Sequence, residues 1–242
     1  MHSANNQMVL FEAQPERSMI AAFLPLWLAG EPIVVAYGMG VDSTAMLIGW
    51  QQKGLPRPNA ILFADTGSEK GETYRYLDVI NAWLQHVGYP QVTVLKRASP
   101  RAGDTSLYGE CVRKSVLPSL AYGGHSCSLK WKVDPQWAHC RRAYGWHQPR
   151  RKKGETEKPA GSWTHGPMIT KLIGYDAGPA DARRIKNAVG KWPPGHRYLY
   201  PLAEWRWDRD TCSEVIRNAG LPGWNPSYLA QDGVTFSRMD WI

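Results

Sequence analysis

Apolar residues along this chain come in short runs that alternate with segments of helical period. Apolar, β-branched runs cover 32–37 and 60–64, and a third run covers 91–96. The stretches between them, 43–53 and 70–87, have the pattern of helices. Short apolar runs bounded by turn residues are typical of strands that are buried on both faces of a parallel sheet. The N-terminal part of the chain therefore predicts strand, helix, strand, helix and strand.

The alternation continues after a polar interruption that extends to about 108. The further expected elements are helical pieces near 111–121 and 127–144, a strand at 168–174, a helix near 180–188, an extended piece at 197–201 and a helix at 208–219. This order predicts an α/β fold, with a mostly parallel twisted sheet and helices on both faces. Right-handed crossovers would bring the loops after the first two strands together at the carboxyl edge of the sheet.

The pattern also divides the chain into segments. We expect an N-terminal helical extension over 1–30, in which the apolar patch 19–29 packs as a helix on the sheet edge. One α/β domain would cover 31–222, with a mobile basic loop at about 148–160, where hydrophobic period is absent. Residues 223–242 are expected to form an irregular tail.

Composition supports a folded domain in an aqueous compartment. The chain has 242 residues, of which 43% are hydrophobic, enough for a core rather than disorder. No apolar run approaches the roughly 18 residues of a membrane span, and no basic region with a cleavage site opens the chain. We therefore expect a soluble cytoplasmic protein that does not enter a membrane.

The candidate chemistry begins directly after the first predicted strand, in the segment from Tyr37 to Thr44. Gly38 and Gly40 permit backbone angles that other residues avoid, and they let an anion approach closely. The Asp-Ser-Thr sequence at 42–44 has the residue types that begin helices. Such a loop aims several backbone N–H groups at one point, at the positive end of a helix dipole. The segment therefore predicts a phosphate site.

Two common phosphate loops are excluded, because a Walker A loop needs a lysine and a Rossmann loop needs a third glycine after Gly40. The segment instead resembles the Ser-Gly-Gly-x-Asp-Ser loop of PP-loop ATP pyrophosphatases. It departs from that loop at Gly38, which replaces the serine, and at Met39, which replaces the first glycine. A positive φ at Met39 would cost about 1–2 kcal/mol outside glycine.

A second segment, 61–77, reads strand, turn and helix, with Asp65 at the end of the strand. It resembles the Asp-Thr-Gly…Glu-Thr-Tyr signature of the phosphoadenosine phosphosulfate (PAPS) reductase branch of the same adenine nucleotide alpha hydrolase-like superfamily. The resemblance implies that Asp65, Thr66 and Gly67 lie beside the nucleotide. For the Glu-Thr-Tyr sequence at 72–74, helix capping and a functional role both stay open.

Three further segments match the family in the same order. Cys127 to Pro135 resembles the lysine-bearing helix of sulfonucleotide reductases, with Lys132 at the lysine and Cys127 at the first cysteine. The second cysteine and the arginine of that pattern are replaced. Leu172 to Arg184 resembles a strand and glycine loop that ends in arginines, which implies Arg183 or Arg184 near the phosphates or sulfate. Tyr200 to Trp205 is the fifth match.

The resemblance implies an enzyme that uses ATP and Mg²⁺. In ATP pyrophosphatases an acceptor attacks the α-phosphorus and pyrophosphate leaves. Ser43 would donate to the phosphates and Asp42 would hold Mg²⁺ beside them. Lys132 with Arg183 or Arg184 would neutralise the departing pyrophosphate or sulfate. The candidate catalytic residues are Asp42, Ser43, Lys132 and Arg184.

The main hypothesis is that the chain cleaves ATP to AMP and pyrophosphate, for sulfur transfer or nucleic-acid modification. Two alternatives stay open beside it. One is a sulfonucleotide reductase or transferase acting on 3′-phosphoadenylyl sulfate. In PAPS reductases a cysteine near the C-terminus attacks sulfur, whereas the last cysteine here is Cys212, in a predicted helix. The other alternative is a non-catalytic nucleotide sensor or nucleic-acid-binding module.

The cysteine spacing and the net charge limit which cofactors and partners are expected. The four cysteines contain no Cys-x-x-Cys pair, so neither an iron–sulfur cluster nor zinc is expected. The net charge of +8 suits a nucleotide pocket or a nucleic-acid acceptor. A homodimer stays open. A run of basic residues could contact nucleic-acid phosphates or be a solvated loop. That run is Arg150, Arg151, Lys152 and Lys153.

Overall fold

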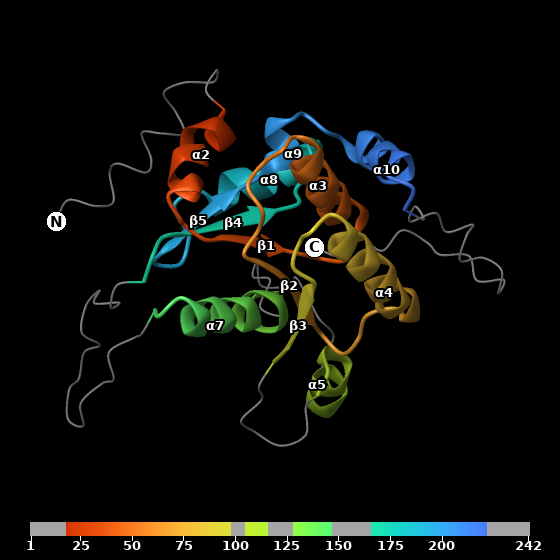
Figure 1. Ribbon diagram of the computed structural model, residues 1–242. Helices are drawn as coiled ribbons and strands as arrows, with labels where there is room; N and C mark the ends of the chain where they lie inside the picture. Colours follow the sequence, from red (N-terminus) through yellow and green to blue (C-terminus); the bar gives the residue numbers. More distant parts are fainter. Residues whose placement is uncertain (1–17, 98–104, 116–127, 147–165, 222–242) are drawn as a thin grey trace, which may run out of the picture.

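The computed structural model describes residues 18–97, 105–115, 128–146 and 166–221. Its first five elements are α2 (Met19–Leu28), β1 (Ile33–Ala36), α3 (Val41–Gln52), β2 (Ala60–Asp65) and α4 (Gly71–His86) (Figure 1). The rest are β3 (Val92–Lys96), α5 (Leu107–Lys114), the π-helix η1 (Leu129–Val133), α7 (Asp134–Ala143), β4 (Ile169–Ile173), α8 (Pro179–Ala188), β5 (His196–Leu199), α9 (Pro201–Glu204) and α10 (Arg209–Asn218).

The five strands form one sheet in the order β3-β2-β1-β4-β5, and every neighbouring pair is parallel. In the register, Val35 of β1 lies opposite Ile61 on one side and Leu172 on the other. The predicted α/β class with a parallel sheet is therefore confirmed. Because all strands run the same way, the loops that follow them leave from one common edge.

Both faces of the sheet are apolar, as the uninterrupted hydrophobic runs predict. Ile33 and Val35 face the larger core, whereas Val34 between them faces a smaller cluster with Cys140 of α7. Residues of α2, α3, α4 and α10 contribute to the larger core. Figure 1 shows these helices on the opposite side of the sheet from α7. Helices on both faces are thus confirmed within the described residues.

The helix α2 is anchored on this core by one tryptophan. The Trp27 indole donates from Nε1 to Thr170 Oγ1 of β4 at 2.9 Å. Its ring lies 5.4 Å from that of Trp50 on α3, between ring centroids. Ser18 caps the helix by accepting from the Ala21 N–H at 3.0 Å. The predicted N-terminal helix is confirmed, and it belongs to the same core as the sheet.

Two predicted helices have different bounds, each for a local reason. The helix expected near 111–121 begins at Leu107, because Ser106 caps it by accepting from the Gly109 N–H at 3.0 Å. The helix expected over 127–144 is interrupted by the π-helix η1. Pro135 has no N–H and cannot make the α-helical bond to residue 131. The α-helix therefore restarts at Asp134.

The extended piece expected at 197–201 is β5, which ends at Leu199. Pro201 starts the short helix α9 instead, because proline has the backbone angle of a first helical turn. Among the described residues, no helix is long and apolar enough to cross a membrane. The predicted tail over 223–242 and the loop at about 148–160 lie outside the described residues.

One glycine lets the loop after β4 approach the start of α3. A Cβ on Gly174 would lie 2.7 Å from Ser43 Cα and 2.8 Å from Ser43 N, both of which are backbone atoms. Backbone atoms cannot move aside as the tip of a flexible side chain can. The contact therefore requires glycine. It keeps the loop after β4 packed against the first turn of α3 at the carboxyl edge of the sheet.

We expect Gly174→Ala to lower the free energy of unfolding by about 1–3 kcal/mol, the usual cost of overpacking. Chemical denaturation would measure the change. Gly71→Ala is the matched control, because its Cβ would meet only the flexible end of Arg75, at 3.8 Å. Equal stability of the two variants would contradict the proposed backbone contact.

Candidate functional site

The candidate site lies where β1 and β4 are neighbours. After β1 the chain adds β2 and β3 on one side of β1, and it later adds β4 and β5 on the other side, so the strand order reverses between β1 and β4. Open α/β sheets bind ligands in the crevice at such a reversal of strand order, outside the carboxyl ends of the strands. Here the reversal places the 37–40 loop beside the 174–178 loop.

The 37–40 loop has one residue in the left-handed backbone conformation. Neither Gly38 nor Gly40 has a positive φ, but Met39 between them has φ 60°. Gly40 is extended, with φ −99° and ψ 176°. The unusual angles that the sequence permits at Gly38 and Gly40 are not used there, and Met39 takes the left-handed conformation instead. The Met39 side chain is only 1% exposed, and its burial in the core offsets the cost of its left-handed backbone.

The space in front of Gly40 is open. A Cβ at this position would meet nothing within 4 Å, and Gly40 is the N-cap of α3. Among the described residues no side chain caps this helix, so N–H groups of its first turn have no hydrogen-bond partner from a capping residue there. An uncapped N-terminus behind a glycine is therefore accessible to an anion.

Hydroxyl groups fasten the loop to the helix from behind. Thr44 Oγ1 donates to the Gly40 carbonyl at 2.8 Å and lies 2.9 Å from the Tyr37 hydroxyl. Ser43 Oγ donates to the same carbonyl at 3.2 Å. Burial raises the pKa of Tyr37, so its phenol stays protonated. Tyr37 and Thr44 thus position the loop, and Ser43 lies within its turn.

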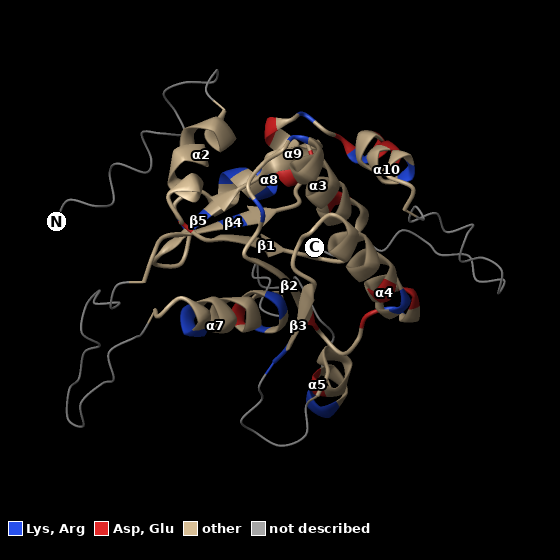
Figure 2. Cartoon of the chain, in the orientation of Figure 1, with Lys and Arg blue, Asp and Glu red and all other residues tan. Residues whose placement is uncertain are grey.

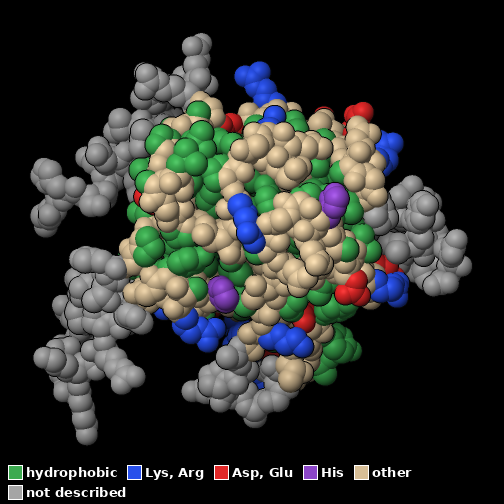
Figure 3. Space-filling view, in the orientation of Figure 1, with side chains coloured by type: hydrophobic (Ala, Val, Ile, Leu, Met, Phe, Trp, Pro, Cys, Tyr) green, Lys and Arg blue, Asp and Glu red, His purple; other side chains and the backbone are tan. Residues whose placement is uncertain are grey.

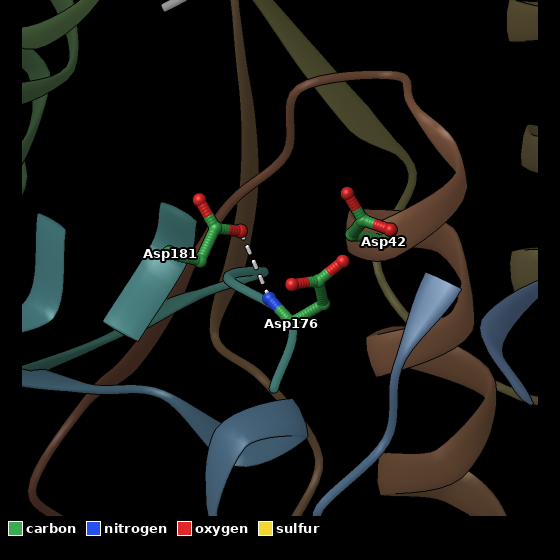
Figure 4. Close-up of side chains that lie close together, drawn as sticks. All are labelled: Asp42, Asp176 and Asp181. Carbon is green, nitrogen blue, oxygen red and sulfur yellow. Dashed lines mark hydrogen bonds between the residues drawn. The ribbon is translucent and has the colours of Figure 1, made fainter. Parts of the chain in front are cut away.

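Three carboxylates meet beside this loop: Asp42 of α3, Asp176 of the loop after β4, and Asp181 of α8. One oxygen from each lies within 4.8 Å of the others, and Figure 4 shows the three side chains converging. Asp176 is held by its own loop, because its N–H donates to Asp181 Oδ2 at 3.0 Å and its Oδ1 accepts from the Gly178 N–H at 2.8 Å.

Two arginines contact the carboxylates. Arg209 Nη1 of α10 lies 2.7 Å from Asp42 Oδ2, and Arg184 Nη1 lies 2.6 Å from Asp181 Oδ1. Asp42 Oδ1 is buried and accepts no hydrogen bond from the described residues. Burial raises the pKa of Asp42 most strongly, the Arg209 charge opposes this, and the Asp176 charge adds to it.

This arrangement fits a divalent cation. Three carboxylates against two arginines leave an excess of one negative charge. Carboxylate oxygens are the ligands that Mg²⁺ prefers, at about 2.0–2.1 Å. The unpartnered Asp42 Oδ1 supplies a buried oxygen that such an ion would satisfy. Asp42, Asp176 and Asp181 are therefore the residues that could hold a metal.

The residues after β2 stabilise their own turn. Asp65 Oδ1 accepts from the Gly67 N–H and from the Tyr74 hydroxyl, each at 2.7 Å. Thr66 Oγ1 donates to Glu69 at 2.9 Å. Gly67 has φ 64°, so it is the residue here whose backbone favours glycine. Asp65, Thr66 and Gly67 lie at the carboxyl edge as predicted. The hydrogen bond from Tyr74 to Asp65 goes beyond helix capping.

The structure places the other predicted residues differently. Arg184 belongs to the carboxylate group, whereas the side chain of Arg183 is exposed. Lys132 is exposed in η1, a segment whose Lys130 and Trp131 contact Glu110 of α5 rather than the aspartates. The four basic residues 150–153 and Cys127 lie outside the described residues.

Two of the described cysteines are buried, Cys140 on α7 and Cys212 on α10. Burial raises the pKa of Cys212 to about 12, and the charge of Asp42 adds to this effect. Burial likewise raises the pKa of Cys140, against the charge of Lys171. Both side chains are therefore thiols at neutral pH. A thiolate nucleophile at Cys212 is not favoured by its surroundings.

Sequence reasoning missed Asp176, Asp181 and Arg209. The Asp-Ala-Gly-Pro-Ala-Asp sequence at 176–181 carried a signal, because aspartate before Gly-Pro favours a turn into a helix. Nothing near Arg209 indicated that it would reach Asp42, which is 167 positions away. No protein-family model matches the chain, and no curated protein sequence matches it.

We expect Asp42→Asn and Asp176→Asn to weaken Mn²⁺ or Mg²⁺ binding at least tenfold, because each removes a charged ligand. Titration calorimetry would measure Mg²⁺, and electron paramagnetic resonance would measure Mn²⁺. Asp210→Asn is the matched control, because this exposed residue follows Arg209 but is not in the carboxylate group. A similar loss in all three variants would contradict the assigned ligands.

The metal affinity should also depend on pH. The ion binds the carboxylate form, and the raised pKa of Asp42 means that protons compete at a higher pH than for an ordinary aspartate. Affinity should be complete above that pKa and fall as the pH decreases through it. Arg209→Ala should move the midpoint upward, because the arginine charge lowers this pKa. Mn²⁺ titrations between about pH 4 and 8 test this; an unchanged or lower midpoint would contradict it.

Proposed function

We propose that this chain is a PP-loop enzyme of the PAPS reductase-like type, which binds ATP with Mg²⁺ and cleaves it to AMP and pyrophosphate to activate an acceptor. The observation that supports it most is the uncapped start of α3, behind the open space at Gly40 and beside three converging carboxylates. Phosphates and a divalent cation are the pair of ligands that such a combination suits.

The proposed residue roles follow from these contacts. Backbone N–H groups over 39–43 would hold phosphate oxygens, whereas the Thr44 N–H already donates to the Gly40 carbonyl at 3.1 Å. Tyr37 and Thr44 would fix the loop from behind. Asp65, Thr66 and Gly67 would border the nucleotide from the end of β2. When bound, the metal would neutralise phosphate charge between Asp42 and the aspartates of the β4 side.

In the reaction, an acceptor oxygen attacks the α-phosphorus, the bond to the bridging oxygen breaks, and pyrophosphate leaves with the electron pair. A sulfur or nitrogen nucleophile then displaces the adenylyl group from the acceptor, and AMP leaves with the acceptor oxygen. No protein nucleophile is needed. Cations near the leaving group favour this step, because they stabilise charge that develops there. Arg209 and Arg184 lie at the carboxylates and suit this role. Arg183 and Lys132 are exposed and would have to approach the bound nucleotide.

The sulfonucleotide hypothesis is less well supported, because it needs a reactive cysteine. Cys212 is buried, and its pKa of about 12 keeps the thiol protonated. A non-catalytic nucleotide sensor would keep the same loop and the same carboxylates. Reaction products separate the three hypotheses: AMP with pyrophosphate, sulfite, or none.

We expect Gly40→Val to weaken ATP binding in the presence of Mg²⁺ more than Gly40→Ala does, because the larger side chain fills more of the open space. Stability should hardly change, since the extended backbone of Gly40 suits β-branched residues. Ser43→Ala should cost about 1 kcal/mol of binding, the value of one hydrogen bond, provided that the hydroxyl turns from the Gly40 carbonyl to a phosphate. Calorimetry measures the affinities, and unchanged ATP affinity in Gly40→Val would place the phosphates elsewhere.

We further expect release of AMP and pyrophosphate that requires Mg²⁺ and is lost in Asp42→Asn. Coupled detection of pyrophosphate and chromatography of the nucleotides would measure it, with Asp210→Asn as control. Thioredoxin-dependent sulfite release from 3′-phosphoadenylyl sulfate would instead support the sulfonucleotide hypothesis. ATP binding without any product, with every acceptor tested, would favour the sensor.

A further inference from the structure

A dense group of cations lies at the carboxyl end of β3. Its centre is Glu110 of α5, whose side chain is buried. Lys114 Nζ lies 2.5 Å from Glu110 Oε1, Arg97 Nη1 lies 3.4 Å from Oε2, and Lys130 also contacts Oε1. Trp131 Nε1 donates to Oε2 at 2.9 Å. Three cations from three segments thus surround one anion, which leaves an excess of two positive charges.

This group stays charged over the physiological pH range. Burial alone would raise the pKa of Glu110, but hydrogen bonds from Lys114, Lys130 and Trp131 lower it to about 2. The carboxylate is therefore ionised and keeps the cations together. Arg97 also stacks its guanidinium on the Trp131 ring, 5.0 Å from the centroid. The geometry of the group is set by several contacts rather than by one flexible ion pair.

Further cations extend this group at the surface. Lys96 has a 77% exposed side chain, and Arg113 and Lys132 are exposed as well. We call the combined set the basic surface, and it consists of Lys96, Arg97, Arg113, Lys114, Lys130 and Lys132. Figure 2 shows blue segments at the end of β3, on α5 and at the end of α7 nearest to β3. Cations on three segments suit an extended anion better than a single phosphate.

Exposed apolar side chains lie on the same short helix as Arg113 and Lys114. Tyr108 of α5 is 72% exposed, and Val112 follows it one helical turn later and is also exposed. The Tyr108 N–H is held by Ser68 Oγ at 2.9 Å. In Figure 3, hydrophobic side chains at the lower right lie next to Lys and Arg side chains in the region of α5. An exposed tyrosine on a helix that also carries cations offers a face on which a nucleic-acid base can stack.

The basic surface continues to the candidate nucleotide site. Lys96 Nζ lies 3.9 Å from Asp65 Oδ2, and the Leu107 N–H donates to the Thr66 carbonyl at 2.8 Å. Asp65 and Thr66 belong to the turn after β2, the strand that pairs with β1. A chain bound along the basic surface would therefore approach the carboxyl edge at which the proposed ATP site lies.

We propose that the basic surface binds single-stranded nucleic acid and presents it as the acceptor of the proposed reaction, an inference that rests on the proposed function. The cations would contact phosphates, and Tyr108 would stack on a base. Bases of a duplex are already stacked on each other, so a duplex offers no face to Tyr108. An acidic protein would match the charge but would gain no stacking.

The test is binding of the full chain to a fluorescently labelled 12-nucleotide single strand, as DNA and as RNA, followed by anisotropy over a series of salt concentrations. In the double variant Lys96→Ala with Arg113→Ala, the slope of log K against log salt should become shallower by about 1.4, since each lost single-strand phosphate contact contributes about 0.7. The matched control is Arg57→Ala with Arg217→Ala, two exposed arginines outside the basic surface that remove the same charge. The control should keep the slope of the unmodified chain.

A second variant separates stacking from charge. Tyr108→Ala should weaken binding at least about fivefold at fixed salt, the lower end of the value of one stacked base, and leave the salt slope unchanged. Tyr108 is exposed and its backbone makes the contact with Ser68, so the variant should fold. Binding that is unaffected by Tyr108→Ala would overturn the stacking role.

Three results would overturn the whole inference: no binding of either strand at low salt, tighter binding of the matching duplex or of an acidic peptide, or an equal change of slope in the control variant. The binding assay contains no ATP, so it succeeds or fails independently of the nucleotide site. Binding of the strand by a chain that does not bind ATP would support the basic surface and reject the proposed function. Cleavage of ATP by a chain that binds no strand would support the proposed function and reject the basic surface as a binding site.

Discussion

The candidate site depends on one close contact, in which the backbone after β4 passes directly against the first turn of α3. Gly174 makes it possible, because a Cβ there would lie 2.7 Å from Ser43 Cα. The contact follows from the parallel pairing of β1 with β4, which lets both strands deliver their loops to one edge. It brings Asp176 to Asp42 and leaves the space at Gly40 open. The proposed metal site and the proposed phosphate site are thus consequences of the same strand order.

The buried Glu110 and the partly buried Asp42 show how differently this chain treats the same chemical group. Glu110 is contacted by three cations and an indole N–H, which lower its pKa to about 2 and make it a structural centre. Asp42 has one arginine on one oxygen and no partner among the described residues on the other. A buried oxygen without a partner costs free energy. That cost is understandable where a ligand completes the coordination, so the contrast favours a cation at Asp42.

The elements and the main loop could be predicted from the sequence, because buried parallel strands and helix-starting residues leave local signals. The positions of β1, β2, α3 and α4 needed only hydrophobic pattern and turn chemistry. The strand order could not be predicted in this way, since no local pattern states that β4 pairs with β1. Asp176, Asp181 and Arg209 were missed for that reason. The sequence did not show that Met39, rather than Gly38 or Gly40, takes the left-handed conformation, because core packing of Met39 decides this.

The charges along the carboxyl edge constrain the order of events in the proposed reaction. Three carboxylates at the β1–β4 end would repel the phosphates of ATP, although the helix start beside them attracts anions. A divalent cation reverses that repulsion, so metal and nucleotide should stabilise each other and bind together. The basic surface at the β3 end is positive without any metal. An anionic acceptor could therefore dock there first, and the chemistry would still wait for the metal and the nucleotide.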